Sequence, residues 1–227
     1  MKTFLIRDIK LLIATLFIAT LFACGKNDTF TDIDGNEYHS IRIGNQIWMA
    51  ENLRTTRFNN GDLIAAAKNA SEWTIDGRAA YSNYANNDSL ATDYGLLYNW
   101  YCISDKREIA PEGWRIPTEA DLRELLQFVG SDSIAASLLK ERGTQHWLPS
   151  FTEGNNATGF SALPGGYKDA DGQSYMRKSN GYYWTTQGSF EFYHWSSRVF
   201  QAFANIERDA KFMKYGFSIK CIKDISR

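Results

Sequence analysis

The chain has 227 residues, of which 15 % are aromatic, and a formal net charge of −1 at pH 7. That length suits one domain, or at most two. Acidic and basic residues are interspersed along the chain without a basic stripe. Because nucleic-acid binding through counterion release requires such a stripe, we predict no nucleic-acid partner.

The N-terminus has the pattern of an export signal. Lys2, Arg7 and Lys10 precede an apolar run over residues 11–23, which only two threonines interrupt. This run is too short to span a bilayer, and it is typical of a signal-peptide core. Its last residues, Leu-Phe-Ala, stand directly before Cys24. This ending resembles the bacterial lipoprotein box, in which the cysteine is acylated and becomes the new N-terminus.

The lipoprotein interpretation predicts an exported protein that is lipid-anchored in the cell envelope, at the outer membrane or the cell surface. Residues 1–23 form the signal peptide, 24–29 the acylated cysteine with a short spacer, and 30–227 one globular domain. Cleavage removes three positive charges and one negative charge, which leaves a net charge of −3. Acyl chains on Cys24 supply the membrane contact. The alternatives are an ordinary signal peptide and an uncleaved anchor.

The first part of the predicted domain has strand character. Apolar residues alternate over residues 30–49 and are separated by Asp34-Gly35 and Gly44-Asn45. These dipeptides favour two-residue hairpin turns because they tolerate positive φ. We therefore predict three short strands. The following segment, residues 62–92, is rich in Asn, Ala, Ser and Tyr, and we expect it to be irregular with short helical pieces.

Three helices are predicted in the middle of the chain. Helical spacing of apolar residues predicts the first over residues 94–104. The second follows Thr118, which can cap it, carries two acids in its first turn and ends at Gly130. The third is expected over residues 132–142.

The last third returns to strands and turns. This order, strands then helices then many strands, predicts the α+β class with an antiparallel sheet in the C-terminal part. The candidate strands are 160–163, 166–167, 175–176, 182–186, 193–198, 201–205 and 217–222.

Two segments share the pattern Asp-x-Asp-Gly, at residues 32–35 and 169–172. An EF-hand needs Gly at loop position 6 and Glu at position 12. Counting from Asp32 or Asp169, both loops fail at both positions. We therefore predict two hairpin tips with Asp-Gly at the central positions, and no metal site. A calcium site of another type, built with distant ligands, is the alternative.

Cys102 and Cys221 are the two cysteines left after Cys24. An exported protein can hold a disulfide between them. They can equally be two buried free thiols that pack as small hydrophobic groups. The sequence leaves both interpretations open, and without a Cys/His cluster it predicts no zinc site.

Motifs of common catalytic and cofactor sites are missing from the sequence. There is no His-Glu-x-x-His, no Walker loop, no Gly-x-Gly-x-x-Gly and no Gly-x-Ser-x-Gly. We therefore predict no cofactor and no catalytic residues.

Aromatic residues suggest a binding role instead, since aromatic rings stack on sugar faces. Seven Trp and twelve Tyr are present, and most Trp are expected in the core. The candidate ligand-binding surface lies late in the chain and combines aromatic, amide and guanidinium groups: Trp195, Tyr193, Arg198, Asn180 and Tyr182.

Several segments together resemble the Fibrobacter succinogenes major paralogous domain family. They are DIDGNEY (32–38), IGNQIWMAENL (43–53), YNWY (98–101), PEGWRIPT (111–118), GFSALPGG (159–166), YWTT (183–186) and GFSIKCIKD (216–224). The resemblance covers about residues 29–225. In that family a cysteine often precedes the Pro-x-Gly-Trp segment, as a partner for the C-terminal cysteine. Here that position is Ala110, and the cysteine is Cys102 instead.

The family is similar to the C-type-lectin-like and sulfatase-modifying superfold, so the resemblance implies a mixed α+β domain on surface or secreted lipoproteins. From these observations the first functional hypothesis is an envelope lipoprotein that binds a glycan or a surface protein without catalysis. An envelope structural or assembly protein without a small ligand is the second. An enzyme on a lectin-like scaffold is the third.

Overall fold

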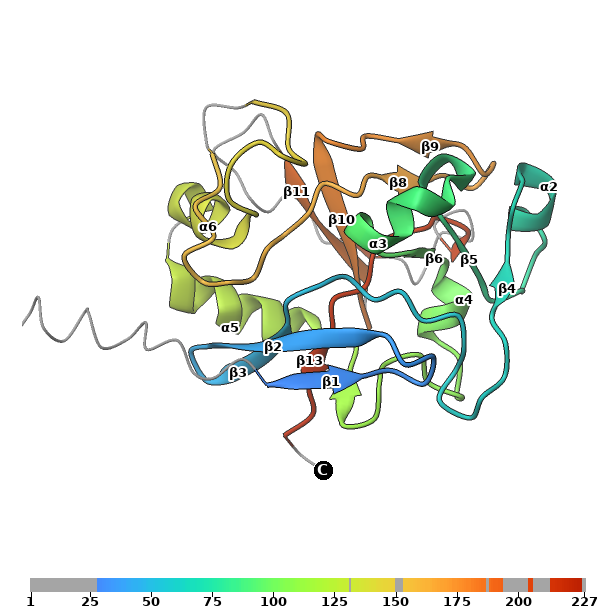
Figure 1. Cartoon of the computed structure of the whole chain (residues 1–227), viewed down its shortest axis with the longest axis horizontal. Coiled ribbons are helices and arrows are strands. Elements are labelled where there is room, and N and C mark those ends of the chain that lie inside the picture. The colour runs from blue at the N-terminus through green and yellow to red at the C-terminus, as the bar shows by residue number, and fades with distance from the viewer. Residues whose placement is uncertain are drawn as a thin grey trace, which may run out of the picture.

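The computed structural model describes residues 28–130, 132–149, 153–186, 188–193, 204–205 and 213–225. Helices and antiparallel sheets are combined in it, which confirms the α+β class (Figure 1). The strands are β1 Thr29–Thr31, β2 Glu37–Ile43, β3 Gln46–Met49, β4 Ala65–Ala66, β5 Ala80–Ser82, β6 Leu97–Tyr98, β7 Trp114–Arg115, β8 Tyr167–Lys168, β9 Ser174–Tyr175, β10 Asn180–Thr185, β11 Gly188–Tyr193, β12 Ala204–Asn205 and β13 Ile222–Lys223. The helices are α2 Ala70–Trp73, η1 Tyr84–Asn86, η2 Asp88–Leu90, α3 Ala91–Tyr94, α4 Trp100–Ile103, α5 Glu119–Val129 and α6 Asp132–Leu139.

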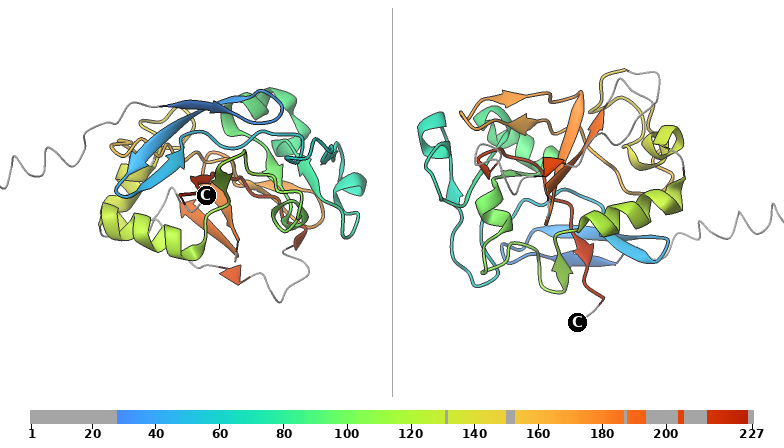
Figure 2. Two further views of the ribbon diagram at one scale, coloured as in Figure 1. Left: turned by 90° about the horizontal axis from the view of Figure 1, so that it is seen from below. Right: turned by 180° about the vertical axis from the view of Figure 1, so that it is seen from behind.

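A five-stranded sheet in the order β1-β2-β3-β13-β7 joins the two ends of the described chain. Its first three strands are the predicted N-terminal hairpins. Ile222 of β13 pairs with Trp48 on one side and Arg115 on the other, so the last strand lies between strands from the first half of the chain. Figure 2 shows β13 running through this sheet. Gly44-Asn45 forms the predicted two-residue turn, in which Gly44 has a φ of +60°.

Helix α5 confirms the predicted caps. The Thr118 side chain accepts a hydrogen bond from the backbone N–H of Asp121, whose carboxylate in turn accepts from the Thr118 N–H. Gly130 ends the helix with a φ of +99°. Leu122 and Leu125 are buried in one core cluster with residues of β2 and β3, so this helix covers the five-stranded sheet.

The prediction of one helix over residues 94–104 was wrong. Helix α3 ends at Tyr94, Gly95 takes a φ of +72°, and residues 97–98 form strand β6 against β5 before α4 begins. Helical spacing of apolar residues could not reveal this interruption, because both Leu97 and Tyr98 are buried in the strand as well. Helix α6 was predicted to end at residue 142 but ends at Leu139. The next residue, Lys140, forms an isolated β-bridge with Ala162 instead of continuing the helix.

The C-terminal part contains the predicted antiparallel sheet, in the order β10-β11-β12. Strand β11 begins at Gly188 and ends at Tyr193, earlier than the strand predicted over 193–198. Most of that predicted strand lies outside the described residues. The family's lectin-like superfold stays an expectation from resemblance.

Both Asp-x-Asp-Gly segments form hairpin loops, but the predicted central pair was wrong. The turn hydrogen bonds run from Gly35 N to Asp32 O and from Gly172 N to Asp169 O. Each glycine is therefore the fourth turn residue, with φ values of +80° and +81°. This arrangement is a three-residue hairpin loop, in which the last turn residue is left-handed.

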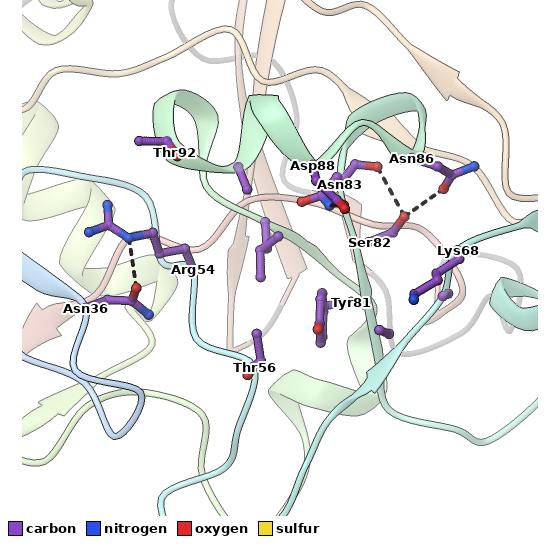
Figure 3. Close-up of a pocket in the computed structure, with 14 residues that line it drawn as sticks. Asn36, Arg54, Thr56, Lys68, Tyr81, Ser82, Asn83, Asn86, Asp88 and Thr92 are labelled. Atoms are coloured by element: carbon purple, nitrogen blue, oxygen red, sulfur yellow. Dashed lines mark hydrogen bonds between the residues drawn. The ribbon is translucent and has the colours of Figure 1, made fainter.

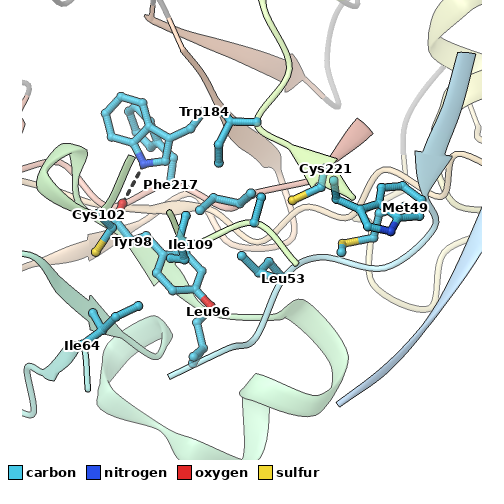
Figure 4. Close-up of a cluster of buried hydrophobic side chains, with 14 of the residues drawn as sticks. Met49, Leu53, Ile64, Leu96, Tyr98, Cys102, Ile109, Trp184, Phe217 and Cys221 are labelled. Carbon is cyan, nitrogen blue, oxygen red and sulfur yellow. Dashed lines mark hydrogen bonds between the residues drawn. The ribbon is translucent and has the colours of Figure 1, made fainter. Parts of the chain in front are cut away.

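The core contains two large aromatic-rich clusters, one of which is drawn in Figure 4, and a smaller third one around Trp73. Cys102 and Cys221 are both free and fully buried in the cluster drawn there. The structure therefore has the two buried thiols, and not the disulfide, of the two interpretations that the sequence left open. They lie toward opposite ends of the drawn side chains (Figure 4). The Cys102 thiol points to Ala80 O at 3.3 Å, and burial raises the pKa of both thiols. Neither thiol is therefore a reactive thiolate.

Within the described ranges, no helix combines the length and apolar character that crossing a membrane requires.

Candidate functional site

A cavity of about 560 Å³ lies where the N-terminal hairpin meets the segment between β4 and α3 (Figure 3). Its walls combine polar and charged side chains with a few small or aliphatic ones. The lining residues are Asn36, Arg54, Thr56, Ala66, Ala67, Lys68, Tyr81, Ser82, Asn83, Asn86, Asp88, Ala91, Thr92 and Leu96. A volume of this size suits a small-molecule or sugar ligand.

The aromatic ring in the cavity wall belongs to Tyr81 on strand β5. Its residues alternate, so Ala80 and Ser82 are buried whereas Tyr81 is half-buried. The Tyr81 ring lies 6.4 Å from the ring of Tyr98, which pairs with it across the sheet. Burial, with smaller contributions from Asp34 and Asp88, raises the pKa of Tyr81. Its hydroxyl is therefore neutral near pH 7 and can both donate and accept a hydrogen bond.

The loop after β5 contributes the amide groups. Ala85 and Asn86 have φ values of 52° and 56°, a left-handed conformation that turns the chain sharply over the cavity. The Ser82 hydroxyl lies 3.0 Å from Asn86 Oδ1, which also accepts a hydrogen bond from Lys168 Nζ at 3.0 Å. The loop is thus held by buried partners, which makes the cavity wall largely preformed.

Asn83 carries an acceptor without a partner. Its Nδ2 donates to the Asp88 carboxylate, but its Oδ1 is buried and makes no hydrogen bond with any residue that the structure describes. A buried acceptor in this state costs roughly 1–3 kcal/mol. A donor from a ligand hydroxyl or from water in the cavity would remove that cost.

Two cationic side chains reach the cavity from different elements. Arg54 follows β3, and its guanidinium lies 5.3 Å from the centre of the Tyr38 ring. Lys68 follows β4. In Figure 3 the two lie on opposite sides of Tyr81. The cavity can therefore offer a ring face, amide and hydroxyl groups, and positive charge to one ligand.

The predicted site residues lie elsewhere. Asn180 pairs with Tyr193 across β10 and β11, so the structure does bring these two positions together. However, Asn180 is only 4 % exposed, and its Nδ2 lies 3.4 Å from the Tyr182 hydroxyl. Tyr182 stacks on Phe217 at 5.4 Å within the core. Tyr193 is described only in its backbone, and Trp195, Arg198 and Cys24 lie outside the described residues.

The carboxylates of the two hairpin loops are engaged by the loops themselves. Asp32 Oδ1 accepts from the N–H groups of Asp34 and Asn36, each at 3.0 Å. Asp169 Oδ1 accepts from those of Asp171 and Gln173, at 2.9 and 2.8 Å. Across the described part of the chain, no group of three or more His, Cys, Asp or Glu side chains is arranged to hold a metal ion.

Sequence reasoning missed the cavity because its residues come from an irregular segment and from the tip of a distant hairpin. One signal was present: Asn83, Asn86, Asn87 and Asp88 stand close together beside Tyr81. Asn87 serves a structural role, since its side chain caps η2. A run of amide residues beside an aromatic one therefore mixes capping and cavity positions, which only the fold separates.

Comparison with known proteins identifies the family of the chain. No curated protein and no solved structure matches it. The family model described as the Fibrobacter succinogenes major domain matches residues 41–223, which include the cavity residues from Arg54 to Leu96 and the C-terminal strand β13. This match spans most of the chain and agrees with the resemblance seen in its sequence segments. The chain therefore belongs to the Fibrobacter succinogenes major domain family.

Proposed function

We propose that this protein is a cell-envelope lipoprotein whose domain binds a glycan, without catalysis, in the cavity around Tyr81. The observation that carries the proposal is the composition of the cavity wall, in which amide, hydroxyl and charged groups surround one partly exposed ring. Sugars present hydroxyl groups at their edges and apolar C–H groups on their faces. A site for them needs both kinds of partner within one concave surface.

The individual groups match that requirement. Tyr81 offers a ring and a neutral hydroxyl, and Asn83 Oδ1 is an acceptor that lacks a donor among the described residues. Thr92 adds a hydroxyl group on the wall, and the Thr56 hydroxyl, which donates to Asp34 Oδ2 at 2.8 Å, adds an acceptor. The aliphatic residues, such as Leu96, leave room for the apolar edges of a ring. Because the loop is held by Ser82 and Lys168, little ordering entropy is lost on binding.

A polysaccharide panel tests the proposal. We expect the mature protein, extracted in mild detergent, to retain at least one glycan in affinity electrophoresis or on a glycan array. Tyr81→Ala should weaken that binding about tenfold or more, because stacking and one hydroxyl are lost together. Tyr175→Ala is the matched control, since this tyrosine is 42 % exposed and lies outside the cavity lining.

Two results would contradict the cavity as the binding site. If Tyr175→Ala and Tyr81→Ala have the same effect, the loss is not specific to the cavity. If binding survives Tyr81→Ala but is lost in Trp195→Ala, the ligand uses the predicted late aromatic surface instead. Retention of no glycan at all would shift the proposal to a protein partner in the envelope.

The lipid anchor is the second part of the proposal and is tested separately. We expect Cys24→Ser to move the protein from the membrane fraction to the soluble fraction and to abolish labelling by an alkyne-bearing fatty acid. This expectation follows from the residues before Cys24, which resemble a lipoprotein box. Continued membrane retention with unchanged labelling would contradict acylation at this residue.

A further inference from the structure

The cavity around Tyr81 contains more positive than negative charge. Arg54 and Lys68 line it, and Asp88 is the acidic residue of its wall. We infer that its ligand is an acidic glycan, one whose sugars carry carboxylate groups, recognised by Arg54 and Lys68. This inference rests on the proposed function, because it names the class of glycan that the same cavity takes.

Arg54 is held in place by neutral groups. Its Nε donates to Asn36 Oδ1 at 3.2 Å, and its Nη2 donates to the carbonyl of Glu37 at 3.3 Å. No carboxylate among the described residues forms an ion pair with it, and its Nη1 makes no hydrogen bond there. The guanidinium is therefore oriented but keeps free donors.

Among the described arginines, Arg78 and Arg177 also have no ion pair with a carboxylate, but they lie outside the cavity lining. Three others differ from Arg54 in this respect. Arg57, Arg107 and Arg115 each face a carboxylate, at 3.1 Å from Asp34, 2.7 Å from Asp105 and 2.6 Å from Asp121 respectively. Arginine binds carboxylates in a planar, often bidentate geometry, which makes it well suited to recognise them. An oriented arginine without such a partner, on a cavity wall, is positioned for the carboxylate of a ligand.

Lys68 supplies the second charge. Its ammonium group makes no hydrogen bond or ion pair within the described chain, and its side chain is exposed at the mouth of the cavity. Figure 3 shows it across the cavity from Arg54, with Tyr81 between them. Two cations that flank a ring suit an oligosaccharide with carboxylates on successive or alternate units, one sugar ring lying on Tyr81.

Asp88 does not cancel this preference. Its carboxylate accepts a hydrogen bond from Asn83 Nδ2, and Asn83 is itself a cavity residue. Asp34, which also acts on Tyr81, is neutralised by its ion pair with Arg57. One carboxylate against the two cations of the lining therefore leaves a positive balance, which attracts an anionic ligand and disfavours a cationic one. The hydrogen bond from Asn83 also engages one oxygen of the Asp88 carboxylate.

The test compares one glycan with and without its charge. The probes are an oligogalacturonate and its carboxyl-reduced counterpart, the neutral galactose oligomer, measured by calorimetry on the detergent-extracted mature protein. We expect the acidic probe to bind at least tenfold more tightly at low salt, and the difference to shrink as salt is raised.

Charge-removing variants locate the effect. Arg54→Gln and Lys68→Gln should each weaken binding of the acidic probe about five- to twentyfold and leave the neutral probe unaffected. Lys223→Gln is the matched control, because it removes the same charge from an exposed position on β13 outside the cavity lining. Lys68 is exposed, so its variant remains informative even if Arg54→Gln disturbs the packing on Tyr38.

The outcomes separate this inference from the proposed function. Equal binding of both probes, dependent on Tyr81, would overturn the acidic specificity and leave glycan binding intact. Equal weakening by Lys223→Gln would also overturn it, because the effect would then be general charge attraction. If neither these probes nor any other glycan binds, the proposed function and this inference fall together.

Discussion

The two Asp-x-Asp-Gly loops have the same backbone turn but different surroundings. In both, the first Asp accepts hydrogen bonds from the N–H groups two and four residues later, and the Gly is the fourth turn residue with a φ near +80°. In the first loop, Asp32 Oδ2 also accepts from the Tyr38 hydroxyl at 2.7 Å and from Asn36 Nδ2 at 2.9 Å. No such additional hydrogen bonds to the Asp169 carboxylate occur among the described residues.

The second loop depends on packing around its glycine instead. A Cβ at Gly172 would lie 2.8 Å from Ala70 Cα of helix α2, whereas a Cβ at Gly35 would meet nothing within 4 Å. Lys168, buried beneath this loop, donates to the Gly172 carbonyl at 3.2 Å. One sequence pattern therefore produces the same local conformation twice. The residues packed around each loop decide whether its aspartate or its glycine contributes more to the stability of the fold.

The largest difference is expected from removing the first aspartate. Asp32→Ala leaves the buried Tyr38 hydroxyl without its acceptor and three loop donors unpaired, so we expect a loss of about 2–4 kcal/mol in the free energy of unfolding. Asp169→Ala removes two bonds to backbone N–H groups and should cost about 1 kcal/mol. Urea unfolding at neutral pH measures both, and equal losses would contradict the comparison.

Substitution of the glycines should destabilise the second loop more than the first, the reverse of the order expected for the aspartates. Gly172→Ala combines a left-handed φ with a contact on the backbone of α2, so we expect a loss of about 2–3 kcal/mol. Gly35→Ala meets only the strain of the left-handed conformation, about 1 kcal/mol. The same urea experiment applies. A larger loss for Gly35→Ala than for Gly172→Ala would show that packing against α2 does not govern the second loop.

Lys168 should make the second loop sensitive to alkaline pH. Burial lowers its pKa in the folded protein, although nearby Asp169 acts in the opposite direction. Between the folded and unfolded pKa values the unfolded chain binds more protons, so the folded state gains stability as pH rises. We therefore expect the stability of wild type relative to Lys168→Met to rise as the pH is raised from 7 toward the ordinary pKa of lysine, and urea unfolding across this pH series measures it.

Lys106→Met, at an exposed loop position, is the control for that pH series. Its stability difference from wild type should stay constant over the same range. If the Lys168→Met difference is equally constant, Lys168 does not titrate differently in the folded and unfolded states.

Calcium should have the smallest effect on either loop. Because both first aspartates are occupied by their own loops, we expect calcium to change the melting temperature by less than about 1 °C. Thermal melts with calcium and with chelator test this. A calcium-dependent shift in melting temperature that chelator removes, and that disappears in Asp171→Asn, would establish a metal site at the second loop. The second loop would then differ from the first in function as well as in packing.

Local signals in the sequence were sufficient for several elements. Thr118 and Gly130 mark the ends of α5, and Gly44-Asn45 marks the turn between β2 and β3, because caps and turns depend on residues close together in the chain. Class α+β followed from the order of such elements. The same reasoning gave a wrong prediction for residues 94–104. The spacing of their apolar residues is compatible with one helix, and also with a short buried strand followed by a short helix.

The candidate site could not be predicted in the same way. Asn36, Arg54, Lys68 and Tyr81 lie in separate turns and strands, and only strand pairing brings them to one cavity. Conversely, Asn180 and Tyr182 have the composition of a binding surface, but the sheet buries Asn180 and stacks Tyr182 on Phe217. Composition indicates which residues can bind sugars, whereas burial decides which of them can reach one.

By itself, the sequence determined the family, the class of fold, the location of both Asp-x-Asp-Gly segments at hairpin tips, and the caps of α5. These features arise from contacts within a few residues or from the order of segments. Tertiary structure alone decided that Cys102 and Cys221 are separate buried thiols, that Arg54 lines a cavity and has no ion pair with a carboxylate of the described residues, and that Asp32 rather than Asp169 contacts a buried hydroxyl. Each of these depends on residues distant in the chain, whose approach is set by the packing of the whole core.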